Sequence, residues 1–325
     1  MKLIIQVPCY NEAETLSKML QDIPKSIQGI DIIETLVVDD GSTDDTYEIA
    51  KSLGVDHIIR LKRNRGLANA FAVGIDACLR LGADIVVNTD ADNQYRGGDI
   101  SALVQPVLKG QADFVLGNRN VFSIKHFSLI KKVLQRMGTK MVGILSDLSV
   151  EDATSGFRAL SREACMKINV LSRFTYTLET IIEAGNRGIV TTSVDIGTNP
   201  VIRDSRLFKN IPEYLARSVT TILRVYATYK PLRVFIALGL PLLLLGMAGI
   251  LRWLYFWLFI EGRATGHIQT LQFGALFTIL GIFIICFGII ADLISTNRQL
   301  LENMLYLIRK MKYDDKEKSS PLSSL

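Results

Sequence analysis

The chain has 325 residues, of which 49% are hydrophobic, and it carries a formal net charge of +5. Its mean hydropathy of +0.27 is high for a wholly soluble protein, and the apolar excess lies in the last third. The mild positive charge suits a membrane surface or phosphorylated ligands, and no RNA- or DNA-binding motif is present, which excludes nucleic acid as a partner. The four cysteines have neither metal nor disulfide spacing and are expected to be reduced in a cytosolic setting.

The first 118 residues alternate short apolar runs with helical patterns. The opening "MKLIIQVPCYNE" has too short an apolar run for a signal peptide and indicates a first strand. Asn11 followed by Glu14 is typical of a capping box at the start of the first helix. Such alternation predicts an α/β domain with a mostly parallel sheet covered on both faces. The expected strands are 3–7, 35–39, 57–60, 85–88 and 114–116, and the expected helices are 13–22, 44–53, 67–81 and 99–109.

Polar motifs follow four of these strands. They are "PCYNE" after the first strand, "DDGSTDDT" after the second, "DADNQ" after the fourth and "GNR" after the fifth. In parallel sheets, ligands bind beyond the carboxyl ends of the strands. Four polar loops at that edge therefore predict a binding site.

The motif after the fourth strand places Asp90 and Asp92 one residue apart, with Gln94 close by. Two carboxylates on the same side of an extended chain repel each other unless a positive charge lies between them. Oxygen ligands of this kind suit Mg²⁺ or Mn²⁺, and such ions commonly take further ligands from substrate phosphates. A turn or helix cap made of Asp and Asn is the alternative interpretation.

The first two motifs point to a nucleoside. Asp39 and Asp40 can accept hydrogen bonds from a base imide or from ribose hydroxyls, while Tyr10 offers a ring for stacking and Glu12 a further carboxylate. Neither G-x-G-x-x-G nor G-x-x-x-x-G-K-[ST] is present, so a dinucleotide site and a P-loop lack their phosphate loop. We therefore expect a nucleoside diphosphate attached to something other than a second nucleotide.

Two later segments have amphipathic helical patterns. Residues 122–147 carry basic side chains among apolar ones, which fits either an ordinary surface helix or a helix lying on the bilayer interface. Residues 209–230 form a second candidate of this kind, directly before the apolar part of the chain. We expect 1–208 to form the main domain, with 122–147 as an acceptor or interface segment and 209–230 as a juxtamembrane helix.

Residues 231–295 contain two long apolar segments, at 234–251 and 273–291, each about long enough to span a bilayer as a helix. A buried helical hairpin in a soluble core is the alternative. Basic residues flank both segments on the outer sides, whereas the connecting loop holds few, so the positive-inside rule places both termini and the main domain in the cytoplasm. Residues 296–325 would be a cytoplasmic tail, polar and disordered after Lys312.

The motifs "PCYNE", "VVDDGSTDDT", "NTDADNQ", "GNR" and "DATSGFRA" in this order resemble family 2 glycosyltransferases with a GT-A, Rossmann-like fold. More narrowly, they are similar to polyisoprenyl-phosphate glycosyltransferases, the group of the dolichyl-phosphate mannose and glucose synthases. The resemblance covers about residues 1–230. Two C-terminal spans also occur in part of that group.

The resemblance also implies roles for individual residues, matched motif by motif. The nucleoside would be bound by Pro8, Tyr10, Glu12, Val37 and Asp39. Asp90 and Ala91 would border the donor, and Asp90, Asp92 and Gln94 would hold the metal ion. The phosphate-contacting arginine would be Arg119, and the acceptor would lie at Asp152, Ser155 and Arg158. Arg203 and Arg206 would be further phosphate ligands, although their loop is shorter than the family's and lacks its glycine. For each arginine, a surface ion pair is the alternative.

These features predict inverting transfer of a hexose from a UDP- or GDP-sugar to undecaprenyl or dolichyl phosphate, giving a lipid-linked sugar for cell-envelope or glycoconjugate assembly. A lipid phosphate has a second pKa near 6, so it attacks largely as a dianion and needs neutralising arginines more than a strong base. The alternatives are a processive polysaccharide synthase, whose Q-x-x-R-W motif is missing, and a non-catalytic membrane protein that binds nucleotide sugars. Whether the protein forms a homo-oligomer in the cytoplasmic membrane is left open.

Overall fold

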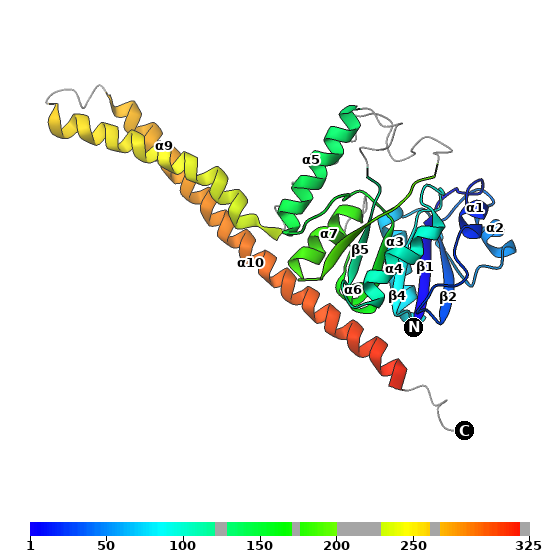
Figure 1. Ribbon diagram of the computed structural model, residues 1–325. Helices are drawn as coiled ribbons and strands as arrows, with labels where there is room; N and C mark the ends of the chain where they lie inside the picture. The colour runs from blue at the N-terminus through cyan, green and yellow to red at the C-terminus, as the bar shows by residue number, and fades with distance from the viewer. Residues whose placement is uncertain (121–128, 171–175, 200–228, 261–266, 319–325) are drawn as a thin grey trace. The chain divides into compact units, whose positions relative to one another are not determined.

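The computed structural model describes residues 1–120, 129–170, 176–199, 229–260 and 267–318, without the side chains of 129–137 and 314–318 (Figure 1). The chain divides into two compact units. The first contains Met1–Tyr214 and Met304–Leu325, and the second contains Leu215–Asn303.

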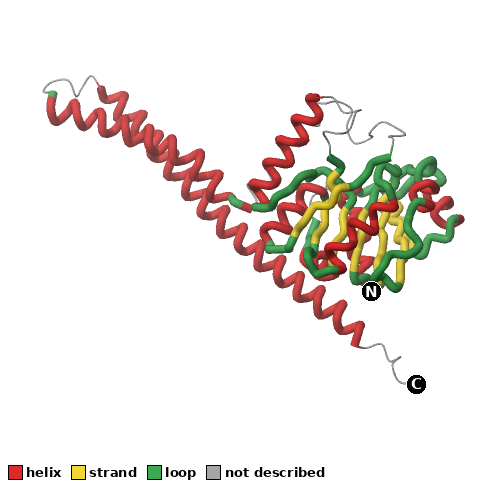
Figure 2. The backbone as a smooth tube through the Cα atoms, in the orientation of Figure 1, coloured by secondary structure: helices red, strands yellow, loops and turns green. Residues whose placement is uncertain are grey.

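The first unit is built on a seven-stranded sheet in the order β3-β2-β1-β4-β6-β5-β7 (Figure 2). Neighbouring strands are parallel except β6, which runs antiparallel to both β4 and β5. The mostly parallel sheet is therefore confirmed, and so is each of the five expected strands. The strands are β1 (Lys2–Cys9), β2 (Ile32–Asp39), β3 (His57–Arg60), β4 (Ile85–Asn88), β5 (Phe114–Asn118), β6 (Arg158–Ser161) and β7 (Thr191–Asp195).

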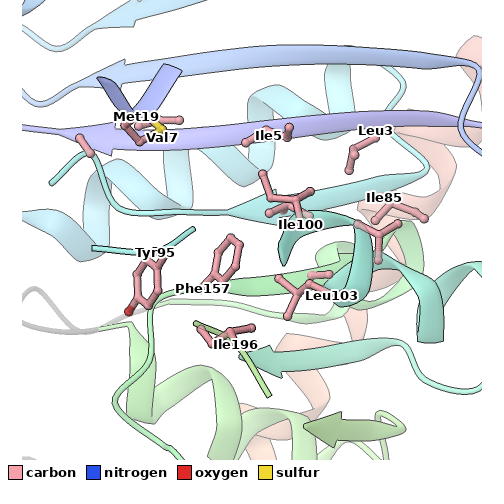
Figure 3. Close-up of a cluster of buried hydrophobic side chains, with 14 of the residues drawn as sticks. Leu3, Ile5, Val7, Met19, Ile85, Tyr95, Ile100, Leu103, Phe157 and Ile196 are labelled. Carbon is pink, nitrogen blue, oxygen red and sulfur yellow. The ribbon is translucent and has the colours of Figure 1, made fainter. Parts of the chain in front are cut away.

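Helices cover both faces of this sheet. Along β1, Leu3, Ile5 and Val7 point to one face and pack in a buried cluster with residues of α1 (Leu16–Gln21) and α4 (Ile100–Leu108) (Figure 3). The side chain of Gln6 points to the opposite face of the sheet and contacts α3 (Leu67–Arg80) there. This alternation is why nearly every residue of β1 is buried. The remaining elements of the domain are α2 (Thr46–Ser52), the short 3₁₀ turn η1 (Gly97–Asp99), α5 (Leu129–Ser146), α6 (Arg162–Lys167) and α7 (Thr177–Asn186).

The capping-box prediction for the first helix is wrong. Helix α1 begins at Leu16, and its N-cap residue Thr15 makes no side-chain capping bond. Asn11 instead has a positive φ of 56°, and its side-chain oxygen accepts a hydrogen bond from the backbone N–H of Thr43. The side chain of Asn11 thus joins the loops after β1 and β2, and tertiary contact has overridden the local capping signal.

The end of α10 (Ile268–Lys318) belongs to the first unit. Tyr306 donates a hydrogen bond to Glu163 (2.6 Å), and Tyr313 donates one to Asp76 on α3. The Arg309 guanidinium donates to the carbonyls of Met166 and Ile168 at the end of α6, which satisfies acceptors that a helix end leaves unpaired. The expectation of a disordered tail after Lys312 is therefore wrong as far as Lys318, because this packing supports the helix.

The second unit contains α9 (Pro231–Phe259) and the first part of α10. Both helices are long and apolar enough to cross a membrane, with mean hydropathies of 2.5 and 2.7 in their most apolar windows, and most of that surface is exposed. Small residues lie where the two helices touch: a Cβ on Gly246 would come within 2.4 Å of Thr278. Close contact at glycine is typical of helix pairs in membranes. A buried hairpin in a soluble core does not fit this exposure.

Candidate active site

The polar motifs meet at one edge of the sheet. Strands β1, β2, β4 and β5 all end there, and β6 begins there because it runs the opposite way. Asn88, the last residue of β4, is paired in register with Arg158, the first residue of β6. The loop "DATSG", residues 152–156, therefore enters the same edge as the motif at Asp90 and Asp92.

Asp39, the last residue of β2, lies at this edge and is fully buried. One carboxylate oxygen accepts a hydrogen bond from the Ser42 backbone (2.8 Å), whereas Oδ2 accepts none from the residues that the structure describes. The half-exposed Arg60 places its Nε 3.3 Å from Oδ2 as an ion pair without hydrogen-bond geometry. A buried acceptor of this kind suits a base imide or a ribose hydroxyl.

The neighbouring carboxylate, Asp40, has a different environment from the expected one. Its two oxygens accept hydrogen bonds from the backbone N–H groups of Arg65 and Gly66, both at 2.8 Å, and so hold the loop before α3. Burial raises the pKa of Asp40, and the two backbone hydrogen bonds act against that rise. Both of its oxygens are thus engaged by backbone groups of the chain itself.

The other residues expected to bind the nucleoside come from β1, from the loop after it and from β2. Tyr10 is 39% exposed, which leaves its ring accessible for stacking. The Glu12 carboxylate accepts a hydrogen bond from Thr15 (2.9 Å), and its backbone N–H donates to Thr46 (2.8 Å). Pro8 and Val37 are buried inside their strands, so only backbone atoms of these two residues can reach a ligand.

The third motif brings Asp90 and Asp92 together with Gln94. The Gln94 backbone N–H donates to Asp92 (3.1 Å), while Ala91 between the two carboxylates is buried. Burial raises the pKa of Asp90 to about 7, and the negative charge of Asp92 adds to the rise, against the opposing charges of Arg119 and Arg158. A pair of carboxylates with this unfavourable charge balance is a suitable site for a divalent cation, which favours their ionised form.

No cluster of three or more His, Cys, Asp or Glu side chains that could hold a metal lies within the part of the chain that the structure describes. A cation at Asp90 and Asp92 would therefore need further oxygen ligands from Gln94, a substrate or water. This donor set fits Mg²⁺ and Mn²⁺, which often bind through one or two carboxylates plus phosphate oxygens.

Arg119, after β5, forms a bidentate ion pair with Asp152. Its Nε lies 2.7 Å from Oδ2 and its Nη2 lies 3.0 Å from Oδ1, and Nη2 also donates to the Thr154 hydroxyl. Both side chains are largely buried, at 11% and 1% exposure. Burial acts to raise the pKa of Asp152, but the hydrogen bonds and charge of Arg119 outweigh it and lower the pKa. Asp152 is consequently a weak proton acceptor at neutral pH.

Arg158, the first residue of β6, lies inside the domain next to this loop. Its guanidinium is fully buried and donates to the backbone carbonyls of Ser155 (2.8 Å) and Thr177 (2.9 Å), and to the Thr180 hydroxyl. Burial lowers its pKa. Ser155 is fully buried as well, so these two residues hold the 152–156 loop against α7. The guanidinium donors of Arg158 are engaged inside the domain, so the expected role of Arg158 at the acceptor would be to hold this loop.

Three residues that sequence reasoning missed also reach this site. The hydroxyls of Tyr95 and Tyr176 and the side-chain amide of Asn88 converge on Gly156, directly beside Asp90. The only local signal was the position of Asn88 and Tyr95 at the two ends of the third motif. Arg203, Arg206, residues 121–128 and most of the juxtamembrane segment lie outside the described residues.

Comparisons with known proteins point to one family. The sequence profile of "Glycosyl transferase family 2" matches residues 4–168. A UDP-N-acetylglucosamine–dolichyl-phosphate N-acetylglucosaminyltransferase from Methanococcus voltae is 32% identical over 176 residues, which cover 49% of this chain and 68% of the relative. A polyprenol monophosphomannose synthase from Mycolicibacterium smegmatis is 30% identical, covering 52% of this chain and 65% of that relative.

Among solved structures, glucosyl-3-phosphoglycerate synthase from Mycobacterium tuberculosis in complex with Mn²⁺, UDP and glucosyl-3-phosphoglycerate has the same fold. It superposes with a TM-score of 0.55 at 20% identity, covering 70% of this chain and 78% of that one. The match of the family profile to half of the chain, together with the motifs gathered at one sheet edge, shows that this chain belongs to glycosyl transferase family 2.

Proposed function

We propose that this chain transfers a hexose from a UDP- or GDP-sugar to a polyisoprenyl phosphate, and that a divalent cation at Asp90 and Asp92 binds the donor diphosphate. One observation carries the proposal: a carboxylate pair and the Arg119–Asp152 ion pair lie at one edge of the sheet. The same edge holds Asp39, whose buried carboxylate oxygen can accept a hydrogen bond from a nucleoside. The names of the two relatives, each a transferase acting on a polyprenyl or dolichyl phosphate, support the class of acceptor.

The donor would lie along the edge from Asp39 to Asp92. Asp39 and Tyr10 would bind the nucleoside, and Mg²⁺ or Mn²⁺ held by Asp90, Asp92 and Gln94 would neutralise the departing diphosphate. The solved fold relative is in complex with Mn²⁺ and UDP, which supports this mode of binding. The anomeric carbon would then face the loop that contains Asp152.

The negative charge of the lipid phosphate determines what the site must supply on the acceptor side. A lipid phosphate approaching a diphosphate donor meets strong repulsion, which Arg119 would reduce while its partner Asp152 keeps the guanidinium in a defined plane. Because the pKa of Asp152 is lowered, its role would be orientation rather than proton removal. A single displacement by the phosphate oxygen inverts the anomeric centre.

A membrane location would bring enzyme and acceptor together. The acceptor phosphate is tethered to an isoprenoid chain in the bilayer, and α9 and α10 are apolar enough to hold the protein in the same membrane. Basic residues before α9 and after the apolar part of α10 support a cytoplasmic catalytic unit in the cytoplasmic membrane.

Transfer can be tested directly with purified full-length protein. Radiolabelled UDP-glucose, UDP-galactose, UDP-N-acetylglucosamine and GDP-mannose are each incubated with undecaprenyl or dolichyl phosphate, and label is measured in the organic phase. We expect one donor to label the lipid, and none to label the matching polyprenyl alcohol, which lacks the phosphate. Label in a water-soluble polymer would instead favour a processive synthase, and donor binding without transfer would favour the non-catalytic alternative.

The role of the metal predicts a second result. Removal of divalent ions with EDTA should abolish transfer, and added Mn²⁺ or Mg²⁺ should restore it. Asp92→Asn should lower transfer about 100-fold, because a neutral amide binds a hard cation more weakly than the carboxylate it replaces. Arg80→Lys keeps the charge of an exposed ion pair remote from the motifs and serves as the control, with activity unchanged. Full activity in EDTA would contradict the proposed metal dependence.

The weak basicity of Asp152 predicts a particular pH dependence. With metal at saturation, kcat/KM should rise from pH 5 to 7 as the acceptor phosphate loses its second proton, with a midpoint near 6. The lowered pKa of Asp152 keeps its carboxylate ionised over this whole range, since a depressed pKa affects protonation only at more acidic pH. Asp152→Asn should lower the rate about 100-fold and keep the same acidic limb. Loss of that limb in the variant would identify Asp152 as the base instead.

Membrane orientation can be measured with fused reporters. Alkaline phosphatase inserted between residues 262 and 263 should be active in cells, and green fluorescent protein fused after residue 325 should fluoresce, because the basic flanks remain in the cytoplasm. The reverse pattern would place the catalytic unit on the other side of the membrane.

A further inference from the structure

We propose that Gly156, Asn88 and Tyr176 form a buried support that determines the position of the Asp90 carboxylate, which makes them positioning residues for the cation. This inference rests on the proposed metal site at Asp90 and Asp92. It concerns the part of the site that the motifs alone did not reveal.

Gly156 lies directly against the Asp90 carboxylate. A Cβ built on Gly156 would come within 2.8 Å of Oδ2 and 2.9 Å of Oδ1 of Asp90, and within 2.8 Å of the Tyr176 hydroxyl. Gly156 is not among the described residues with positive φ, so its backbone conformation would allow other residues. The absence of a side chain is therefore needed for space: the carboxylate occupies the volume that a methyl group would fill.

The backbone of Gly156 is held from both sides. Its N–H donates to the Tyr95 hydroxyl (2.9 Å), and its carbonyl accepts from Nδ2 of Asn88 (2.8 Å). The second proton of the Asn88 amide goes to the Tyr176 hydroxyl (2.8 Å), and Oδ1 of Asn88 accepts from Gln6 on β1 (2.9 Å). Every hydrogen-bonding direction of the Asn88 amide except one oxygen lone pair is thus used, which leaves it a single orientation.

Aromatic stacking fixes the two hydroxyl groups. Tyr176, fully buried at the start of α7, stacks on Phe71 of α3 with ring centroids 4.1 Å apart and planes 7° apart. Tyr95 stacks on Phe157 at 5.0 Å. The support next to Asp90 therefore consists of residues from β1, β4, α3 and α7. Together these residues form one rigid surface beside the carboxylate.

An ordinary polar core network is the competing interpretation. Such a network would contribute to stability but would leave the affinity for the cation unchanged. The two interpretations differ for Gly156→Ala, which keeps the backbone N–H and carbonyl of residue 156 but places a methyl group against the Asp90 carboxylate and the Tyr176 hydroxyl. They also differ for Tyr176→Phe, which keeps the stacked ring and removes only the hydroxyl. Outer-sphere partners of metal ligands commonly change metal affinity by about 10- to 100-fold.

The experiment measures Mn²⁺ binding to the full-length protein by electron paramagnetic resonance, alone and with UDP or GDP, for wild type and variants. We expect Gly156→Ala to weaken Mn²⁺ binding at least tenfold and Tyr176→Phe about threefold or more. The Mn²⁺ concentration for half-maximal transfer should rise in parallel, while kcat at saturating Mn²⁺ recovers in Tyr176→Phe. Gly98→Ala is the matched control, because a Cβ there meets nothing within 4 Å, and its Mn²⁺ affinity should equal that of wild type.

Each result is decisive. Mn²⁺ affinity within twofold of wild type in a folded Gly156→Ala protein, judged by its melting temperature and near-UV circular dichroism, overturns the inference while the proposed function stands. If Gly156→Ala does not fold, Tyr176→Phe decides alone, and unchanged affinity in that variant overturns the inference. Wild-type protein that binds no Mn²⁺ even with nucleotide refutes the metal site itself.

Discussion

The reversal of one short strand determines how this site is assembled. Because β6 runs antiparallel between β4 and β5, the loop at 152–156 arrives at the edge where its neighbours end. Asp152 can then meet Arg119 from the end of β5, and Gly156 can meet Asp90 from the end of β4. With β6 parallel, the same loop would lie at the opposite edge of the sheet, away from both partners.

Charge is distributed unequally along this edge. Asp90 and Asp92 form a concentrated negative region, in which burial and mutual repulsion act against ionisation. Arg119 and Asp152 form a buried bidentate pair, which holds the guanidinium in one plane. Under the proposed function, a ligand that brings negative charge would meet a cation on one side, and on the other a guanidinium whose geometry is already set. We regard this preorganisation as the main contribution of the fold to catalysis, since it avoids rearrangement during the reaction.

Local sequence patterns predicted the parallel part of the sheet and the place of the acidic motif at a strand end, because both depend on residues close together in the chain. Asp90, Asp92 and Gln94 follow a short apolar run and needed no tertiary information. The pairing of Arg119 with Asp152 joins residues 33 positions apart, and it depends on a four-residue strand, β6, that begins with a buried arginine. An arginine at a strand start normally indicates exposure, so neither β6 nor the burial of Arg158 could be predicted from the pattern. The hydrogen bonds that Asp40 accepts from the backbone of the loop before α3 likewise could not be predicted from the local pattern.

The contacts of Tyr306, Arg309 and Tyr313 make the catalytic unit discontinuous in sequence, since residues after 303 pack onto a domain that the first 214 residues otherwise build. A water-soluble catalytic fragment ending before α9 would leave Asp76, Glu163 and the carbonyls at the end of α6 without these partners. A better soluble version would replace the apolar helices with a flexible linker and retain residues 304–318. The membrane part is, in this respect, an insertion within a globular domain rather than an appendage to it.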